Sequence, residues 1–142
     1  MLVPRSGPVC ALLLLTAACS WGAETALPRE YYVGYSTDAP GLMGDRFSCP
    51  HGRVDLRALM EELRQAIDDK LSANHLGDIR DVIDLDAPDE IGAKAIEGQF
   101  YVRYLFSQRL SSDVVIPGEG GVILIVRPCS KEVVDAVFFT FP

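Results

Sequence analysis

The chain has 142 residues, of which 49% are hydrophobic, and its 13 Lys and Arg against 20 Asp and Glu give a net charge of −7. This length is enough for one domain with its own hydrophobic core. The acidity and the scattered basic residues argue against nucleic acid or an anionic lipid surface as a partner, because both require clustered Lys and Arg, and they favour a basic protein partner.

Residues 1–18 have the pattern of a secretory signal peptide. One positive charge, Arg5, precedes an uncharged segment from Ser6 to Ala23, whose apolar centre covers residues 9–15. This centre is far shorter than the ~20 apolar residues that a membrane-spanning helix needs. We therefore expect export of the chain, without a permanent transmembrane anchor.

The segment ends in Thr16-Ala17-Ala18-Cys19, which resembles the lipobox of bacterial lipoproteins. The resemblance covers residues 1–20 only, and Thr16 departs from the Leu usual in that family. It implies cleavage before Cys19, a diacylglycerol on Cys19 and a membrane-anchored domain in the cell envelope. Ser20 in the next position implies delivery to the outer membrane, facing the periplasm. A plain signal peptide cut after Ala18 or Ser20 is the alternative.

Cleavage before Cys19 divides the chain into the signal peptide, a lipid-anchored tether over residues 19–30 and a single domain over residues 31–142. It removes Arg5 and leaves 12 basic and 20 acidic residues, a net charge of −8 with the terminal amine acylated. The tether is small and polar without periodicity, which is typical of a flexible linker.

The remaining cysteines form a natural pair. Cys10 leaves with the signal peptide and Cys19 receives the lipid, so Cys49 and Cys129 are left in an oxidising compartment. We expect a disulfide between them.

The first half of the domain combines a strand, a loop and a long helix. Aromatic residues and Val predict a strand over residues 31–35, and Gly, Pro and Asp predict a loop over residues 36–52. Apolar residues at three- and four-residue spacing predict a helix over residues 56–74, with Asp55 as its N-cap and Gly77 at its end.

An acidic cluster follows, from Asp78 to Glu90. A calcium loop is one interpretation, but the Gly and Glu that an EF-hand needs are missing from their positions. The alternative is a short strand over residues 82–85 and a short helix that begins at Pro88 and ends near Gly98.

The last third of the chain has the alternation of a sheet. Strands are predicted over residues 100–107, 114–116, 122–126 and 133–141, with a turn over residues 117–121 joining the second and third. The strand over 122–126 is apolar on both faces and is expected at the centre of the sheet. The fold class predicted is α+β: an antiparallel sheet of four or five strands with one long and one short helix packed on one face.

The sequence contains only weak candidates for a metal site or a catalytic site. His51 and His75 with Cys49 and Cys129 are the residue types of a zinc site, but Cys-x-His is an unusual ligand spacing and a disulfide would consume both thiols. No Gly-x-Ser-x-Gly motif or other nucleophile arrangement is present, so we expect neither catalytic residues nor a metal or other cofactor.

We therefore expect a cell-envelope lipoprotein whose acidic domain binds a protein partner, as an assembly accessory or as an immunity or inhibitor protein. Tyr31 and Tyr32, taken as exposed, are the speculative contact residues. A non-catalytic carrier or sensor of a small ligand is the alternative, and a small envelope hydrolase is a lesser one.

Overall fold

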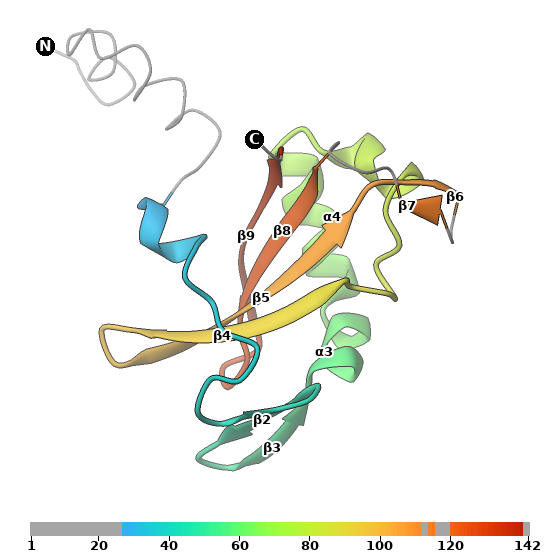
Figure 1. Ribbon diagram of the computed structural model, residues 1–142. Helices are drawn as coiled ribbons and strands as arrows, with labels where there is room; N and C mark the ends of the chain where they lie inside the picture. Colours follow the sequence, from blue (N-terminus) through green and yellow to red (C-terminus); the bar gives the residue numbers. More distant parts are fainter. Residues whose placement is uncertain (1–26, 112–113, 116–119, 141–142) are drawn as a thin grey trace, which may run out of the picture.

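The computed structural model describes residues 27–111, 114–115 and 120–140 (Figure 1). The predicted signal peptide, Cys19 and most of the predicted tether lie outside this part. Two antiparallel sheets of three and four strands, together with two α-helices, confirm the α+β class. The elements in chain order are η1 (Arg29–Tyr31), β1 (Leu42–Met43), β2 (Arg46–Cys49), β3 (Gly52–Asp55), α3 (Leu56–Glu62), α4 (Arg64–Ala73), η2 (Gly77–Asp81), β4 (Glu90–Ile96), β5 (Gln99–Ser107), β6 (Arg109–Ser111), β7 (Val114–Val115), β8 (Gly121–Arg127) and β9 (Glu132–Phe139).

The large sheet has the strand order β4-β5-β8-β9. Strand β8 is buried almost throughout, which confirms its predicted central place. One face of the sheet contributes Val102, Tyr104 and Leu124 to the main core, where they join apolar side chains of α3 and α4. The Tyr104 hydroxyl donates a hydrogen bond of 2.7 Å to the Leu56 carbonyl, so helix and sheet are also joined by a polar contact inside this core.

The opposite face of the large sheet is covered in part by the residues that follow the tether. Tyr32 packs with Tyr101, Ile123 and Ile125 in a second buried cluster. The segment over residues 31–35 is therefore not the strand that its aromatic residues predict. It forms η1 and a turn, because the tyrosine rings lie against a completed sheet.

Each edge strand of the large sheet has a polar contact with a segment outside the sheet. On β4, Ser36 pairs with Ala93 in an isolated bridge. On β9, the side-chain amide of Asn74 donates a hydrogen bond of 2.7 Å to the Ala136 carbonyl.

The predicted helix over residues 56–74 is present with one interruption. It is divided at Leu63 into α3 and α4. Asp55 is the N-cap, as expected, and accepts hydrogen bonds from the backbone N–H groups of Arg57 and Ala58. The Ala58 bond, followed by the smaller one from Arg57, holds the pKa of Asp55 below its usual value, against the opposing effect of desolvation. The helix ends at Ala73, before the predicted Gly77.

Three further predictions of local structure are wrong. The loop predicted over residues 36–52 contains β1, β2 and the start of β3, which form the small sheet. Residues 82–85 form no strand, and the predicted short helix from Pro88 to Gly98 is strand β4. The prediction failed because the acidic residues after Pro88 are typical of the first turn of a helix. Within the observed strand, Ala93 is buried and Ala95 is exposed.

The last strands differ from the prediction in their pairing. Strand β7 pairs with β6, so it is not the hairpin partner of β8, which pairs with β5 and β9. Residue 116 of the predicted second strand, residues 117–119 of the predicted turn and residue 141 at the end of the predicted final strand lie outside the described part. No helix among the described residues is both long and apolar enough to cross a membrane.

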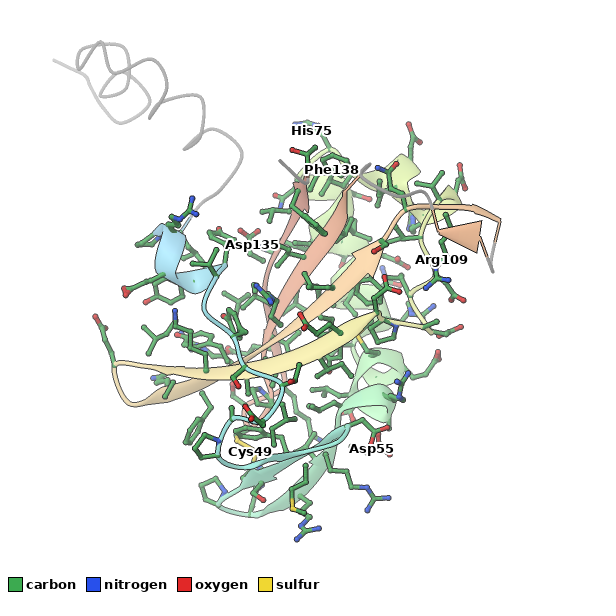
Figure 2. All side chains as sticks on the ribbon, in the orientation of Figure 1. Cys49, Asp55, His75, Arg109, Asp135 and Phe138 are labelled. Atoms are coloured by element: carbon green, nitrogen blue, oxygen red, sulfur yellow. A yellow bond between two sulfur atoms is a disulfide. The ribbon has the colours of Figure 1, made fainter. Side chains whose placement is uncertain are left out.

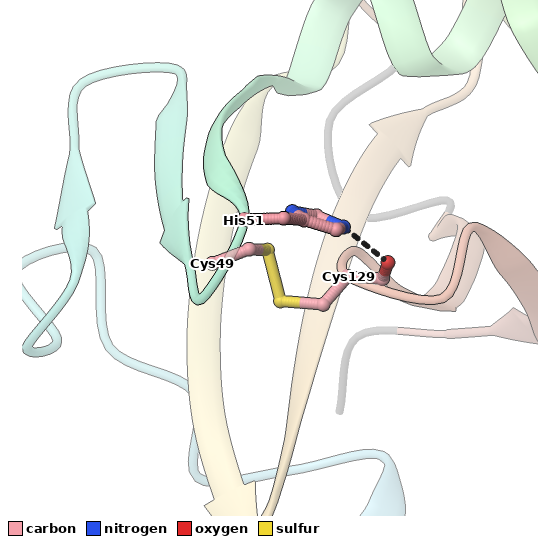
Figure 3. Close-up of a disulfide and its surroundings, with 3 residues drawn as sticks. All are labelled: Cys49, His51 and Cys129. Atoms are coloured by element: carbon pink, nitrogen blue, oxygen red, sulfur yellow. Dashed lines mark hydrogen bonds between the residues drawn. A yellow bond between two sulfur atoms is a disulfide. The ribbon is translucent and has the colours of Figure 1, made fainter.

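Cys49 and Cys129 form the expected disulfide, with Cα atoms 5.5 Å apart (Figure 3). It joins the turn between β2 and β3 to the turn between β8 and β9, and so ties the small sheet to the large one. His51 Nε2 lies 3.2 Å from the Cys129 carbonyl oxygen. The disulfide leaves no thiol for a zinc site, and Figure 2 shows His75 at the opposite end of the molecule from Cys49.

Candidate functional site: a charged groove

A groove with a volume of about 480 Å³ is bounded by the first turns of α4, by η2 and by the loop that leads to β4. Figure 2 shows Arg109 of β6 on this side of the molecule. Three arginines and four aspartates dominate the lining, which consists of Arg64, Asp68, Arg80, Asp81, Val82, Ile83, Asp84, Leu85, Asp86 and Arg109.

The loop over residues 82–86 is held in place by its apolar side chains. Ile83 and Leu85 are only 7% and 9% exposed and belong to the main core. The alternating residues Asp84 and Asp86 are half-buried and exposed respectively. The segment predicted as a strand is therefore a loop with one side in the core, and this places the two carboxylates at the groove.

Each arginine of the groove is already paired with a carboxylate. Arg64 lies 2.7 Å from Asp86, and it also contacts Glu61 at 3.0 Å. Arg80 lies 3.1 Å from Asp68. The third cation, Arg109, pairs at 2.9 Å with Asp89, next to the groove. All these side chains are partly exposed, so the pairs contribute little to stability and mainly set the charge pattern.

Two carboxylates of the groove remain without a cation. Neither Asp81 nor Asp84 forms a salt bridge with any described residue, although Asp84 Oδ1 accepts a hydrogen bond of 2.9 Å from the Asp86 backbone N–H. Asp81 is exposed and Asp84 is half-buried. The groove therefore has an excess of negative charge that a guanidinium or ammonium group would neutralise.

Among the described residues that line the groove, there is no Ser, Thr, Cys, Lys or His beside the carboxylates. This lining therefore offers no nucleophile with an adjacent base. Within the ranges that the structure describes, no three His, Cys, Asp or Glu side chains converge as a set of metal ligands, and this includes the acidic cluster from Asp78 to Glu90. The arrangement is suited to binding a cationic group.

The speculative contact residues Tyr31 and Tyr32 differ in their surroundings. Tyr31 is half-buried, with its ring edge-on to Tyr101 at a centroid distance of 5.4 Å. Tyr32 is only 3% exposed. The expectation of an exposed aromatic pair is therefore wrong for Tyr32, because its ring covers the large sheet.

Asp135 is a buried charged residue that the sequence reasoning missed, and it is 3% exposed. The Tyr32 hydroxyl donates a hydrogen bond of 2.5 Å to Asp135 Oδ2, and Asn74 Nδ2 donates one of 2.9 Å to Oδ1. The Tyr32 hydroxyl also accepts from the Leu27 N–H at 3.1 Å. The one signal in the sequence is an acidic residue inside the apolar run Val133–Phe139. The carboxylate ties the start of the domain to α4 and β9, so its role is structural.

Comparison of the chain with protein-family models, with curated proteins and with solved structures gives no match.

Proposed function

We propose that the chain is a cell-envelope lipoprotein, anchored through Cys19 to the outer membrane on its periplasmic side, whose acidic domain binds a basic protein partner in the charged groove. It acts by binding and not by catalysis. One observation supports a basic partner. Among the described residues, Asp81 and Asp84 form no salt bridge, whereas every arginine of the groove forms one.

The chemistry of the groove favours a protein side chain from the partner. A Lys or Arg reaching between Asp81 and Asp84 gains a charge-assisted hydrogen bond, while the same two carboxylates repel acidic groups. The overall charge of −7 adds long-range attraction for a basic partner and speeds its association. The lipobox resemblance and the disulfide support an oxidising compartment as the place of this contact.

Photo-crosslinking in cells tests the groove. A photoreactive amino acid at Val82, which is half-buried in the lining, should crosslink to a partner. Asp81→Asn with Asp84→Asn should reduce that crosslink at least tenfold, since two charged contacts are lost. The matched control is Glu30→Gln with Glu97→Gln, which changes the net charge equally at exposed sites outside the groove. Equal loss in both double variants, or no crosslink at all, would refute the groove as the binding site.

The anchor has an independent test. Cys19→Ser should stop incorporation of labelled fatty acid and release the domain from isolated membranes. Unchanged acylation, or unchanged membrane attachment after a high-salt wash, would contradict lipidation at Cys19.

A further inference from the structure

The small sheet has one buried and one exposed face. Leu42, Phe47 and Val54 point into the core and are at most 8% exposed. The opposite side, called here the outer face of the small sheet, consists of Met43, Arg46, Ser48, Arg53 and Asp55, all of them exposed.

Strand pairing gathers charges on this face that are separate in the sequence. Arg46 is opposite Met43 on one side and Asp55 on the other, and Arg53 is opposite Ser48. Arg46 and Arg53 are therefore diagonal neighbours on one face of a hairpin. The sequence spacing of seven residues does not reveal this, so the basic residues are less scattered than composition indicates.

The positive charge of the face is available to a partner. Neither Arg46 nor Arg53 forms a salt bridge within the described part of the chain. The one carboxylate of the face, Asp55, accepts two backbone hydrogen bonds at the start of α3 and lies opposite Arg46, so two positive charges and one negative charge share the face. Met43 is 66% exposed beside the arginines, the highest exposure among the large exposed hydrophobic side chains that the structure describes. An exposed thioether on β1, directly opposite Arg46 on the central strand β2, places an apolar group beside the arginines, which matches the boundary between lipid headgroups and acyl chains.

We propose that the outer face of the small sheet docks on the anionic surface of the membrane that holds the lipid anchor, and so orients the domain. This inference rests on the proposed lipidation of Cys19. Residues 19–26 connect that residue to Leu27 at the start of the described domain, and a chain of this length spans at most about 29 Å. The tether thus keeps the domain beside the bilayer at high effective concentration, where a weak contact is sufficient.

The same charges explain why one face is selected. The rest of the domain is acidic and is repelled by anionic headgroups, whereas each arginine near such a surface favours contact roughly fivefold. Asp55 on the same face opposes one of the two arginines, so the membrane-facing orientation is favoured roughly fivefold. The selection is electrostatic, so salt and neutral lipids weaken it.

The test uses the full chain, acylated in cells, purified from membranes and reconstituted into vesicles of phosphatidylethanolamine with phosphatidylglycerol. A fluorophore is placed through Ser48→Cys on the outer face, or through Ser72→Cys on the exposed side of α4 as reference. Lipids with nitroxide headgroups quench fluorophores that lie at the membrane surface. We expect strong quenching at position 48 and at least fivefold weaker quenching at position 72.

Charge variants and lipid composition separate the contributions. Arg46→Gln with Arg53→Gln should lower quenching at position 48 at least fivefold, and so should vesicles of phosphatidylcholine alone. Lys70→Gln with Lys131→Gln removes the same charge from other parts of the domain and should leave quenching unchanged. Equal quenching at both positions, or quenching that ignores the two arginines or the anionic lipid, overturns the docking face.

Vesicle flotation, measured on the same samples, distinguishes this inference from the proposed anchor. A chain that floats with the vesicles but shows no quenching at position 48 retains its anchor and refutes the orientation. A chain that does not float refutes the anchor, and with it the orientation that depends on the anchor.

Discussion

Tyr32→Phe isolates the buried hydrogen bond to Asp135. The substitution keeps the ring that covers the large sheet and removes the hydroxyl that donates to Asp135 Oδ2 at 2.5 Å. Both residues are 3% exposed, so water does not replace the lost donor without disturbing the cluster. A hydrogen bond to a charged group contributes about 1.5–3 kcal/mol, and the Leu27 N–H loses its acceptor as well. We expect the free energy of unfolding to fall by about 2–3 kcal/mol.

Tyr104→Phe is the matched control. Tyr104 is fully buried, and its hydroxyl donates to an uncharged acceptor, the Leu56 carbonyl at 2.7 Å. That carbonyl belongs to the first turn of α3 and keeps a helical hydrogen bond, so the loss should be about 1 kcal/mol. The only tryptophan, Trp21, precedes the described domain, so urea unfolding should be followed by far-ultraviolet circular dichroism. Equal losses in the two variants, at unchanged urea dependence, would refute the charge-assisted role of Tyr32.

Three other changes test the framework. Cys49→Ala with Cys129→Ala opens a loop with a sequence separation of 80 and, in the chain-entropy model, lowers the free energy of unfolding by about 4–5 kcal/mol, measured by urea unfolding against the oxidised parent. The lowered pKa of Asp55 means that its stabilising effect is complete above the usual pKa of 3.8 and is lost as the pH falls through the folded-state value. Asp55→Asn should therefore flatten the decline in melting temperature below pH 4, and an unchanged decline would contradict it. A Cβ at Gly121 would lie 1.8 Å from the Phe106 carbonyl oxygen, so Gly121→Ala should prevent the β5–β8 pairing and abolish a cooperative thermal transition.

Elements with a strong period were predictable from the sequence. The helix over residues 56–74 and strand β5 follow from the spacing of their apolar residues, and the buried β8 follows from a continuous apolar run. The disulfide followed from the number of cysteines and the expected compartment. Even the interruption at Leu63 leaves the apolar stripe of α3 and α4 in one core.

The errors arise where tertiary contacts override local preference. Strand β4 begins just after Pro88 and acidic residues that are typical of a helix N-terminus, but it takes its conformation from the ladder with β5. Tyr32 lies in an aromatic segment that predicts a strand, but its ring packs against one face of the large sheet. The charged groove is assembled from α4, η2, a loop and β6, so no sequence window contains it.

The polar contacts on the edges of the large sheet have a consequence for self-association. An open strand edge is a template for joining the sheets of separate molecules. The side chain of Asn74 donates a hydrogen bond to the Ala136 carbonyl on one edge, and the backbone of Ser36 forms a β-bridge with Ala93 on the other. We expect Asn74→Ala, which exposes the Ala136 carbonyl on the β9 edge, to increase self-association and to lower solubility by more than its loss of stability explains.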